Sequence, residues 1–147
     1  MNQRIENCFI TIIDTDAELP ELYFLEMEDH IRKNWEQRFT FVFGPFNIFN
    51  KNNQDVPAVT RVFDHMVSSF QMSNIVNMTG FGFAVSNYSA SYNLIKKVDF
   101  WDTNEDCITE DLHFMQKACW KTEGQMKTVS IFVPANEMSI ETGNGYW

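Results

Sequence analysis

The sequence predicts one α/β layered domain, and three observations lead to this prediction. The chain has 147 residues, enough for a single domain with a real core and too few for two. Hydrophobic residues make up 44% of it, as in ordinary globular proteins. Short β-branched or aromatic runs alternate along the chain with stretches of helical periodicity, which is the pattern of a layered α/β fold.

The N-terminal third predicts a strand followed by a helix. Cys8 to Ile13 is a β-branched and aromatic run that ends at Asp14, so we expect a buried strand. Pro20 suits the first position of a helix that runs to about Asn34, with acidic residues near its positive end. The buried side of this helix is expected to consist of three apolar residues, Leu22, Phe24 and Leu25.

The middle of the chain predicts a second strand and a second helix. Arg38 to Phe43 alternates and then meets Gly44-Pro45, where we expect the strand to stop. Phe46 to Asp55 is rich in Asn and predicts an irregular loop. Pro57 opens a helix in which apolar residues recur at helical spacing. These residues are Val59, Val62, Phe63, Met66, Val67 and Phe70.

The C-terminal part predicts a strand, two helices and a last strand. Gly80 to Val85 suggests a strand, and Ser91 to Val98 a short helix. Thr109 is a suitable N-cap for a helix that ends before Gly124. Met126 to Val133 alternates as a closing strand, which gives the order β-α-β-α-β-α-α-β. The shared face of the longer helix is expected to contain Leu112, Met115, Ala118 and Cys119.

Charge and composition argue against several classes of function. The net charge is −9 and no Lys/Arg cluster is present, which argues against nucleic-acid binding. The three cysteines and three histidines show no spacing typical of a disulfide framework or a zinc site. No apolar run approaches the ~18 residues of a membrane span, and the first residues lack the apolar segment of a secretory signal.

Asp14 and Asp16 follow the first predicted strand and suggest a metal site. Strand ends in α/β proteins are where ligands bind, and two carboxylates there can reach one ion. Mg²⁺ or Mn²⁺ prefers such hard ligands and keeps water and substrate phosphate in its remaining positions. The alternative is a polar turn with solvated carboxylates.

Thr109-Glu110-Asp111 opens the later helix and is a candidate base. The helix dipole favours acidic residues in a first turn, so simple capping is an alternative explanation. The same dipole keeps a carboxylate ionised and ready to accept a proton. Trp101-Asp102-Thr103 precedes this helix and is expected to be either a turn with Trp101 in the core or a contact to substrate.

The two acidic motifs together resemble those of family 2 glycosyltransferases of the GT-A fold. Ile12-Ile13-Asp14-Thr15-Asp16 resembles their metal-binding Asp-x-Asp motif, and Thr109-Glu110-Asp111 their Thr-Glu-Asp motif. The resemblance implies a partial GT-A, Rossmann-like domain with a mixed sheet flanked by helices. It implies that Asp14 and Asp16 bind Mg²⁺ or Mn²⁺, that Asp111 is the catalytic base and that Glu110 assists it. Trp101, Asp102 and Thr109 are the implied substrate contacts.

Further phrases resemble a membrane-associated subgroup of this family. They are Asn52 to Val62, Ser86 to Ser91, and Phe100-Trp101-Asp102-Thr103, and the likeness extends from about Ile10 to Ala135. The implied reaction is inverting transfer of a sugar from a nucleotide-diphosphate donor to a glycan or other hydroxyl acceptor. The implied parent protein is membrane-associated, although no span lies in these residues.

Two departures from the family pattern concern the ends of the domain. Nothing upstream of Ile5 supplies the strands that hold the nucleotide base in the family, and the chain stops at Gly145-Tyr146-Trp147 without a Gln-x-x-Arg-Trp motif. We therefore expect residues 1–147 to form a single partial domain, the middle and acceptor-side part of a catalytic domain. A piece of this kind is expected to be inactive by itself.

Two other functions remain open from the sequence. A phosphatase of the haloacid dehalogenase type also places Asp-x-Asp after a strand, with Asp14 as nucleophile and Asp16 as acid/base. Glu18 stands where that family has Thr or Val. A truncated, inactive transferase-like domain that binds a metal or a partner is the non-enzymatic alternative.

Overall fold

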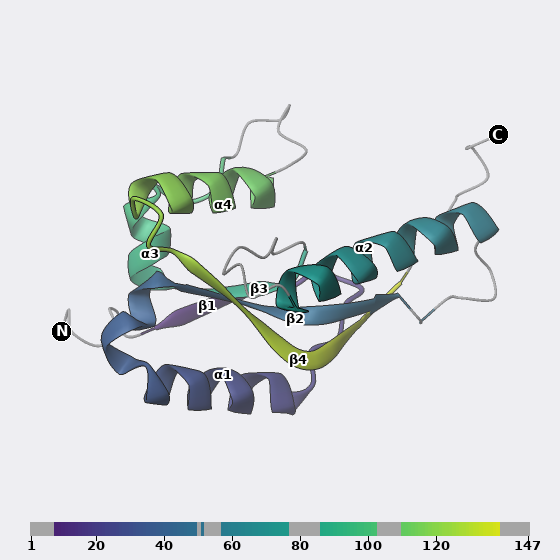
Figure 1. The fold of residues 1–147 in the computed structure, drawn as a ribbon, viewed down its shortest axis with the longest axis horizontal. Coiled ribbons are helices and arrows are strands. Elements are labelled where there is room, and N and C mark those ends of the chain that lie inside the picture. Colours follow the sequence, from purple (N-terminus) through teal and green to yellow (C-terminus); the bar gives the residue numbers. More distant parts are fainter. Residues whose placement is uncertain (1–7, 50, 52–56, 77–85, 103–109, 139–147) are drawn as a thin grey trace.

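The structure, a computed structural model, describes residues 8–49, 51, 57–76, 86–102 and 110–138. It confirms the α/β class with a mixed four-stranded sheet flanked by helices (Figure 1). The strands are β1 (Phe9–Ile12), β2 (Phe41–Phe49), β3 (Tyr88–Ser91) and β4 (Lys127–Glu137). The α-helices are α1 (Glu21–Lys33), α2 (Ala58–Val76), α3 (Tyr92–Lys97) and α4 (Glu110–Lys121), and a 3₁₀ helix, η2 (Trp35–Thr40), precedes β2.

The topology of the sheet gathers strand ends at one edge. The strand order is β1-β3-β2-β4, with β3 antiparallel to both of its neighbours and β2 parallel to β4. β1, β2 and β4 therefore run in the same direction and end at the same edge, where β3 begins. The residues that follow β1 and end β4 meet the first residues of β3 there.

Each face of the sheet carries its own hydrophobic cluster. Phe41 and Phe43 of β2 face α1, whereas Val42 between them faces α3 and α4. This follows from the two-residue period of a strand, whose side chains alternate between the faces. Figure 1 shows α1 on one side of the sheet and α2 and α4 on the other.

The buried side of α1 differs from the sequence prediction. Leu22 and Leu25 are each 52% exposed and Phe24 is 41% exposed, whereas Tyr23 is fully buried. Tyr23 packs with Phe43 in the cluster beneath the sheet, and its hydroxyl donates to the Phe43 carbonyl (3.1 Å). Met27 and Ile31, partly buried, continue this face at four-residue intervals.

β2 also differs from the prediction, since it does not stop at Gly44-Pro45. The strand begins at Phe41, after η2, and continues to Phe49 along β4, so Phe46 to Phe49 are not irregular loop. The register between β2 and β4 shifts between Pro45 and Phe46. Proline lacks an N–H for the ladder, and a local irregularity of this kind is where a strand tolerates it.

The remaining elements agree with the predictions in large part. α2 begins directly after Pro57, α3 is capped by Ser91, and α4 is followed by Gly124 with φ 77°. β4 runs beyond Val133 to Glu137, and β3 was not predicted. The strand predicted for Gly80 to Val85 lies outside the described residues. The apolar side chains Val59, Val62, Phe63 and Met66 of α2 are exposed.

Candidate active site

Asp14 and Asp16 lie in the turn after β1, at the edge where the parallel strands end. The Asp14 carbonyl accepts a hydrogen bond from Ala17 N–H (3.0 Å), which closes the turn. One carboxylate oxygen of Asp16 accepts from Met138 N–H (3.2 Å), directly after β4. Lys51 Nζ donates to the Asp16 carbonyl (2.6 Å). The turn is therefore attached to the ends of both β2 and β4.

Asn87 connects this turn to Glu137 at the end of β4. Its side-chain oxygen accepts from Asp14 N–H (3.0 Å), and its side-chain nitrogen donates to the Glu137 carboxylate. Asn87 is only 1% exposed. We call Asp14, Asp16 and Glu137 the acidic edge. One buried amide therefore links the Asp14 backbone to the Glu137 side chain.

Glu137 has a strongly shifted pKa. It is 4% exposed, and burial together with the nearby charges of Asp14 and Asp16 raises its pKa to about 7. The hydrogen bond from Asn87 acts in the opposite direction but does not offset these effects. Glu137 therefore takes up a proton within the physiological pH range.

Asp111 lies in the first turn of α4, and its carboxylate accepts a hydrogen bond from the hydroxyl of Tyr88 (2.8 Å). Burial raises the pKa of the Asp111 carboxyl, and the Tyr88 hydrogen bond lowers it. The charges of Glu110 and Asp14 raise it further. Asp14 and Asp111 are thus close enough for their charges to interact, although they come from opposite ends of the described chain.

Trp101 and Asp102, two of the predicted substrate contacts, interact with other side chains of the protein. Trp101 stacks on Phe114 (ring centroids 5.2 Å apart, interplanar angle 17°), and its indole N–H donates to the Tyr88 hydroxyl (2.6 Å). Asp102 pairs with Lys117 Nζ (3.0 Å) and, at 3.5 Å, with His113. The hydrogen bond from Lys117 lowers the pKa of the Asp102 carboxyl. Thr109 lies outside the described residues.

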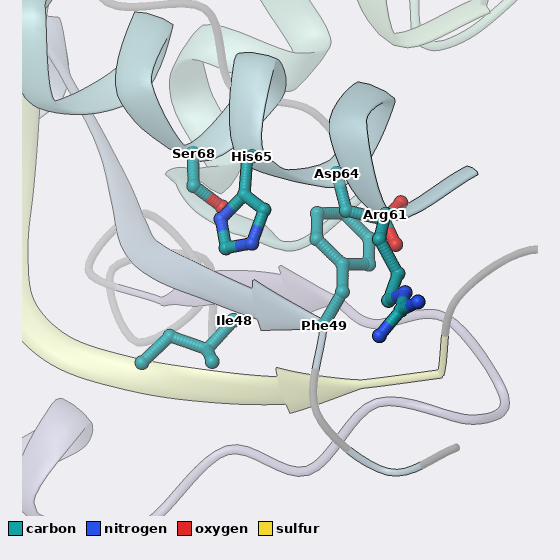
Figure 2. Close-up of a pocket in the computed structure, with 6 residues that line it drawn as sticks. All are labelled: Ile48, Phe49, Arg61, Asp64, His65 and Ser68. Carbon is teal, nitrogen blue, oxygen red and sulfur yellow. The ribbon is translucent and has the colours of Figure 1, made fainter. Parts of the chain in front are cut away.

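A pocket of about 260 Å³ lies between α2 and the end of β2. Figure 2 shows Arg61, Asp64, His65 and Ser68 of α2 around it, opposite Ile48 and Phe49 of β2. Phe49 is the register partner of Glu137 in β4. Asp64 is buried, and its charge also raises the pKa of Glu137. Asp64 of α2 thus acts electrostatically on Glu137 of the acidic edge.

The sequence prediction missed Asn87, Tyr88 and Glu137 as residues of this site. Asn87 and Tyr88 belong to the segment Ser86 to Ser91, whose sequence indicates a family resemblance but no role in the site. The polar composition of this segment is a signal that could have identified them. A strand of Tyr, Ser and Ala that is buried on both faces needs polar partners for its side chains. Glu137 is the last residue of β4, beyond Val133 where the predicted strand ends, and no local pattern distinguishes it from a solvated strand end.

Asp14 and Asp16 are the carboxylates expected to bind the metal ion. Within the residues that the structure describes, no three His, Cys, Asp or Glu side chains gather closely enough to form a complete metal cage. Asp14 is exposed and Asp16 half-buried, and both belong to the turn at this edge. This pair suits Mg²⁺ or Mn²⁺, which take their other ligands from water and substrate phosphate.

Comparisons with known proteins place these observations in a family. In the described parts of the chain, no helix has both the length and the apolar character needed to cross a membrane. Searches among curated proteins and among solved structures give no match. A family model described as glycosyl transferase family group 2 matches residues 9–144, nearly the whole chain, and the chain therefore belongs to this family.

Proposed function

We propose that this chain carries the metal-binding and base residues for inverting transfer of a sugar from a nucleotide-diphosphate donor to an acceptor hydroxyl. One observation supports the proposal most directly. Asn87 and Tyr88, consecutive at the start of β3, contact the turn of Asp14 and the carboxylate of Asp111 respectively. The two acidic motifs thus share one support at the carboxyl edge of the sheet.

Asp111 is the proposed general base. The acceptor oxygen forms a bond to the anomeric carbon while the bond from that carbon to the donor diphosphate breaks, and the hydroxyl proton passes to Asp111. A base works best when its pKa lies near the working pH. Burial of Asp111, with the charges of Glu110 and Asp14, moves its pKa in that direction. Glu110, exposed at the start of α4, orients the acceptor.

Asp14 and Asp16 are the proposed ligands of Mg²⁺ or Mn²⁺. The bound cation supplies neutralisation of the negative charge that develops on the leaving diphosphate. Asp102 and Thr109 complete the proposal as the substrate contacts that the family resemblance implies. Trp101, the third residue so implied, is held by Phe114 and the Tyr88 hydroxyl. The membrane association of the parent protein is part of the same proposal and derives from the sequence resemblance alone.

The test replaces Asp111 with Asn in the full-length protein, because residues 1–147 are expected to be inactive by themselves. Release of nucleoside diphosphate is measured with a panel of UDP- and GDP-hexoses, Mn²⁺ and added hydroxyl acceptors. Because general-base catalysis contributes about 10²- to 10⁴-fold, Asp111→Asn is expected to lose at least about 100-fold in kcat. Asp29→Asn, the same chemical change at an exposed site on α1, is the control and should retain wild-type turnover.

Two outcomes would contradict the proposal. Turnover of Asp111→Asn at the wild-type rate would remove Asp111 from the chemistry. Calorimetric binding of Mn²⁺ and donor by the wild-type protein, without release of nucleoside diphosphate, would favour the non-catalytic alternative. Loss of Mn²⁺ binding in Asp14→Asn and Asp16→Asn would support the metal site in either case.

A further inference from the structure

Tyr88, Trp101 and Asp111 form a hydrogen-bonded chain beside the proposed base. The Trp101 indole nitrogen lies 2.6 Å from the Tyr88 hydroxyl oxygen, and that oxygen lies 2.8 Å from a carboxylate oxygen of Asp111. Tyr88 is fully buried. Its ring stacks on Phe114, which also stacks on Trp101. The aromatic rings therefore fix the two donors in place.

The chemistry of the donors sets the direction of this chain. An indole N–H can only donate, so the Tyr88 oxygen must accept from Trp101. The single hydroxyl proton of Tyr88 then points to Asp111, which accepts it most strongly when ionised. Trp101 polarises the hydroxyl as well, because hydrogen bonds in a chain strengthen one another. The arrangement selects one orientation of the Asp111 carboxylate.

The backbone around these residues is held in uncommon conformations. Ser86, two residues before Tyr88, has φ 64°, and Asp99 and Phe100, directly before Trp101, have φ 64° and 61°. Such left-handed conformations are unfavourable for non-glycine residues and persist where the surrounding structure enforces them.

Lys117 of α4 supplies part of that enforcement. Its amino group donates to the Phe100 carbonyl (2.8 Å) and to Asp102 (3.0 Å). The segment that carries Trp101 is thus attached on both sides of Trp101 to the helix that carries Asp111. A backbone hydrogen bond from Ser86 also reaches Asp111 and lowers its pKa.

We propose that Tyr88 and Trp101 are positioning residues for Asp111: Tyr88 holds one carboxylate oxygen of the base, and Trp101 fixes the direction of the Tyr88 proton. The inference rests on the proposed function of Asp111. In this proposal Trp101 acts on Asp111 through the Tyr88 hydroxyl and does not stack on a sugar. The other oxygen of Asp111 is then presented to the acceptor hydroxyl in one orientation.

The first test follows the hydrogen-bonded chain itself by NMR, without substrate. The Trp101 indole N–H and the Asp111 carboxyl carbon, assigned with Trp101→Phe and Asp111→Asn, are titrated with pH. In the wild type the chemical shifts of both signals should change with pH, and the two titrations should have the same midpoint. In Tyr88→Phe the indole signal should no longer follow Asp111, and the Asp111 midpoint should rise, because a hydrogen bond to its ionised form is lost. Glu110 and Asp14, the charged groups that act on Asp111, are unchanged in this variant.

The second test is kinetic and uses the same UDP- and GDP-hexose panel. Misplacement of a reacting group by about 1 Å can cost about 100-fold, so Tyr88→Phe is expected to lower kcat by about 10- to 100-fold with little change in KM. The acidic limb of the kcat–pH profile of Tyr88→Phe should shift to higher pH, together with the titration midpoint of Asp111. Trp101→Phe, which keeps an aromatic ring on Phe114 but removes the donor, should cause a smaller loss in kcat.

A control variant and two different contradicting results distinguish failure of this inference from failure of the proposed function. Tyr92→Phe, the same change at a half-buried tyrosine of α3, should alter neither signal. An Asp111 midpoint and an indole signal unchanged in Tyr88→Phe would overturn the positioning pair alone. Wild-type turnover of Asp111→Asn would instead overturn the proposed function.

Discussion

A single residue, Asn87, satisfies groups from two distant segments. Its amide accepts a hydrogen bond from Asp14 N–H through the oxygen and donates one to Glu137 through the nitrogen, a combination that an ionised carboxylate, which only accepts, cannot reproduce. Because Asn87 is buried, water does not readily replace it. The position of the Asp14 turn relative to β4 therefore depends on this amide.

Asn87→Ala is expected to destabilise the protein by about 2–4 kcal/mol. The substitution removes the partner of the buried Glu137 carboxylate and of the part-buried Asp14 N–H, and a buried polar group left without a partner costs about 1–3 kcal/mol. Urea denaturation monitored by circular dichroism at pH 7 measures the change in the free energy of unfolding. Gln116→Ala, at an exposed position of α4, is the control and should change it by less than about 0.5 kcal/mol. Equal stabilities of the two variants would show that Asn87 does not support the edge.

Among the elements, α1 shows how one buried residue fixes the face of a helix. Tyr23 occupies the position that the sequence prediction gave to its neighbours, and its hydroxyl has two buried partners. It contacts the Phe43 carbonyl (3.1 Å) and Ser89 Oγ (2.9 Å) in β2 and β3. Burial raises the pKa of Tyr23 to about 12, so the hydroxyl remains neutral throughout the physiological range.

Tyr23→Phe is expected to cost about 1–2 kcal/mol, since it removes these hydrogen bonds and retains the ring. Leu25→Ser, on the exposed side of α1, should change the free energy of unfolding by less than about 0.5 kcal/mol. Chemical denaturation of both variants gives the comparison. A larger loss for Leu25→Ser than for Tyr23→Phe would mean that the original prediction of the buried face was correct.

The elements predicted correctly are those with strong local signals. β1 is a compact apolar run, and the start of α2 and the end of α4 are marked by Pro57 and Gly124. The expected burial of β1 was wrong, because β1 lies at the edge of the sheet and its residues are only partly buried. β3 has no such signal, because its sequence Tyr-Ser-Ala-Ser is short and polar, and its burial arises from β1 and β2 on either side. The buried face of α1 was missed because apolar residues surround Tyr23 in sequence, and only the sheet decides which of them is covered.

For the candidate site, the sequence allowed prediction of the acidic motifs but not of their support. Asp14, Asp16 and Asp111 each stand at the end or start of an element that local patterns identify. Asn87 and Glu137 acquire their surroundings only when β3 and the end of β4 meet, which depends on contacts between residues far apart in the chain. Sequence patterns of short range do not contain this information.

At the scale of the whole molecule, the four-stranded sheet matches a partial GT-A domain of the family. The carboxylates of its acidic edge contribute to a net charge of −9, and repulsion among these negative charges opposes folding. A bound divalent cation at the edge would offset that repulsion. The stability of the molecule without a cation should accordingly depend on pH through the buried carboxyls.

Glu137 dominates the expected pH dependence. Its pKa is raised from 4.5 to about 7 on folding, so the folded protein binds an extra proton between these values. The contribution of Glu137 to the free energy of unfolding is therefore most favourable below about pH 4.5. This contribution is lost as the pH rises through 7. The full difference is about 3 kcal/mol. The raised pKa of Asp111 acts in the same direction.

Glu137→Gln should remove most of this dependence, because the Gln amide is neutral at every pH and its oxygen can still accept from Asn87. The free energy of unfolding, measured by urea denaturation at pH 5, 6, 7 and 8, should fall with pH in the wild type and much less in the variant. At pH 8 the variant should be more stable by about 1–3 kcal/mol. Glu36→Gln, at an exposed position of η2, should follow the wild-type curve. Parallel curves for wild type and Glu137→Gln would show that Glu137 ionises normally in the folded protein, and hence that the edge is more solvated than its burial indicates.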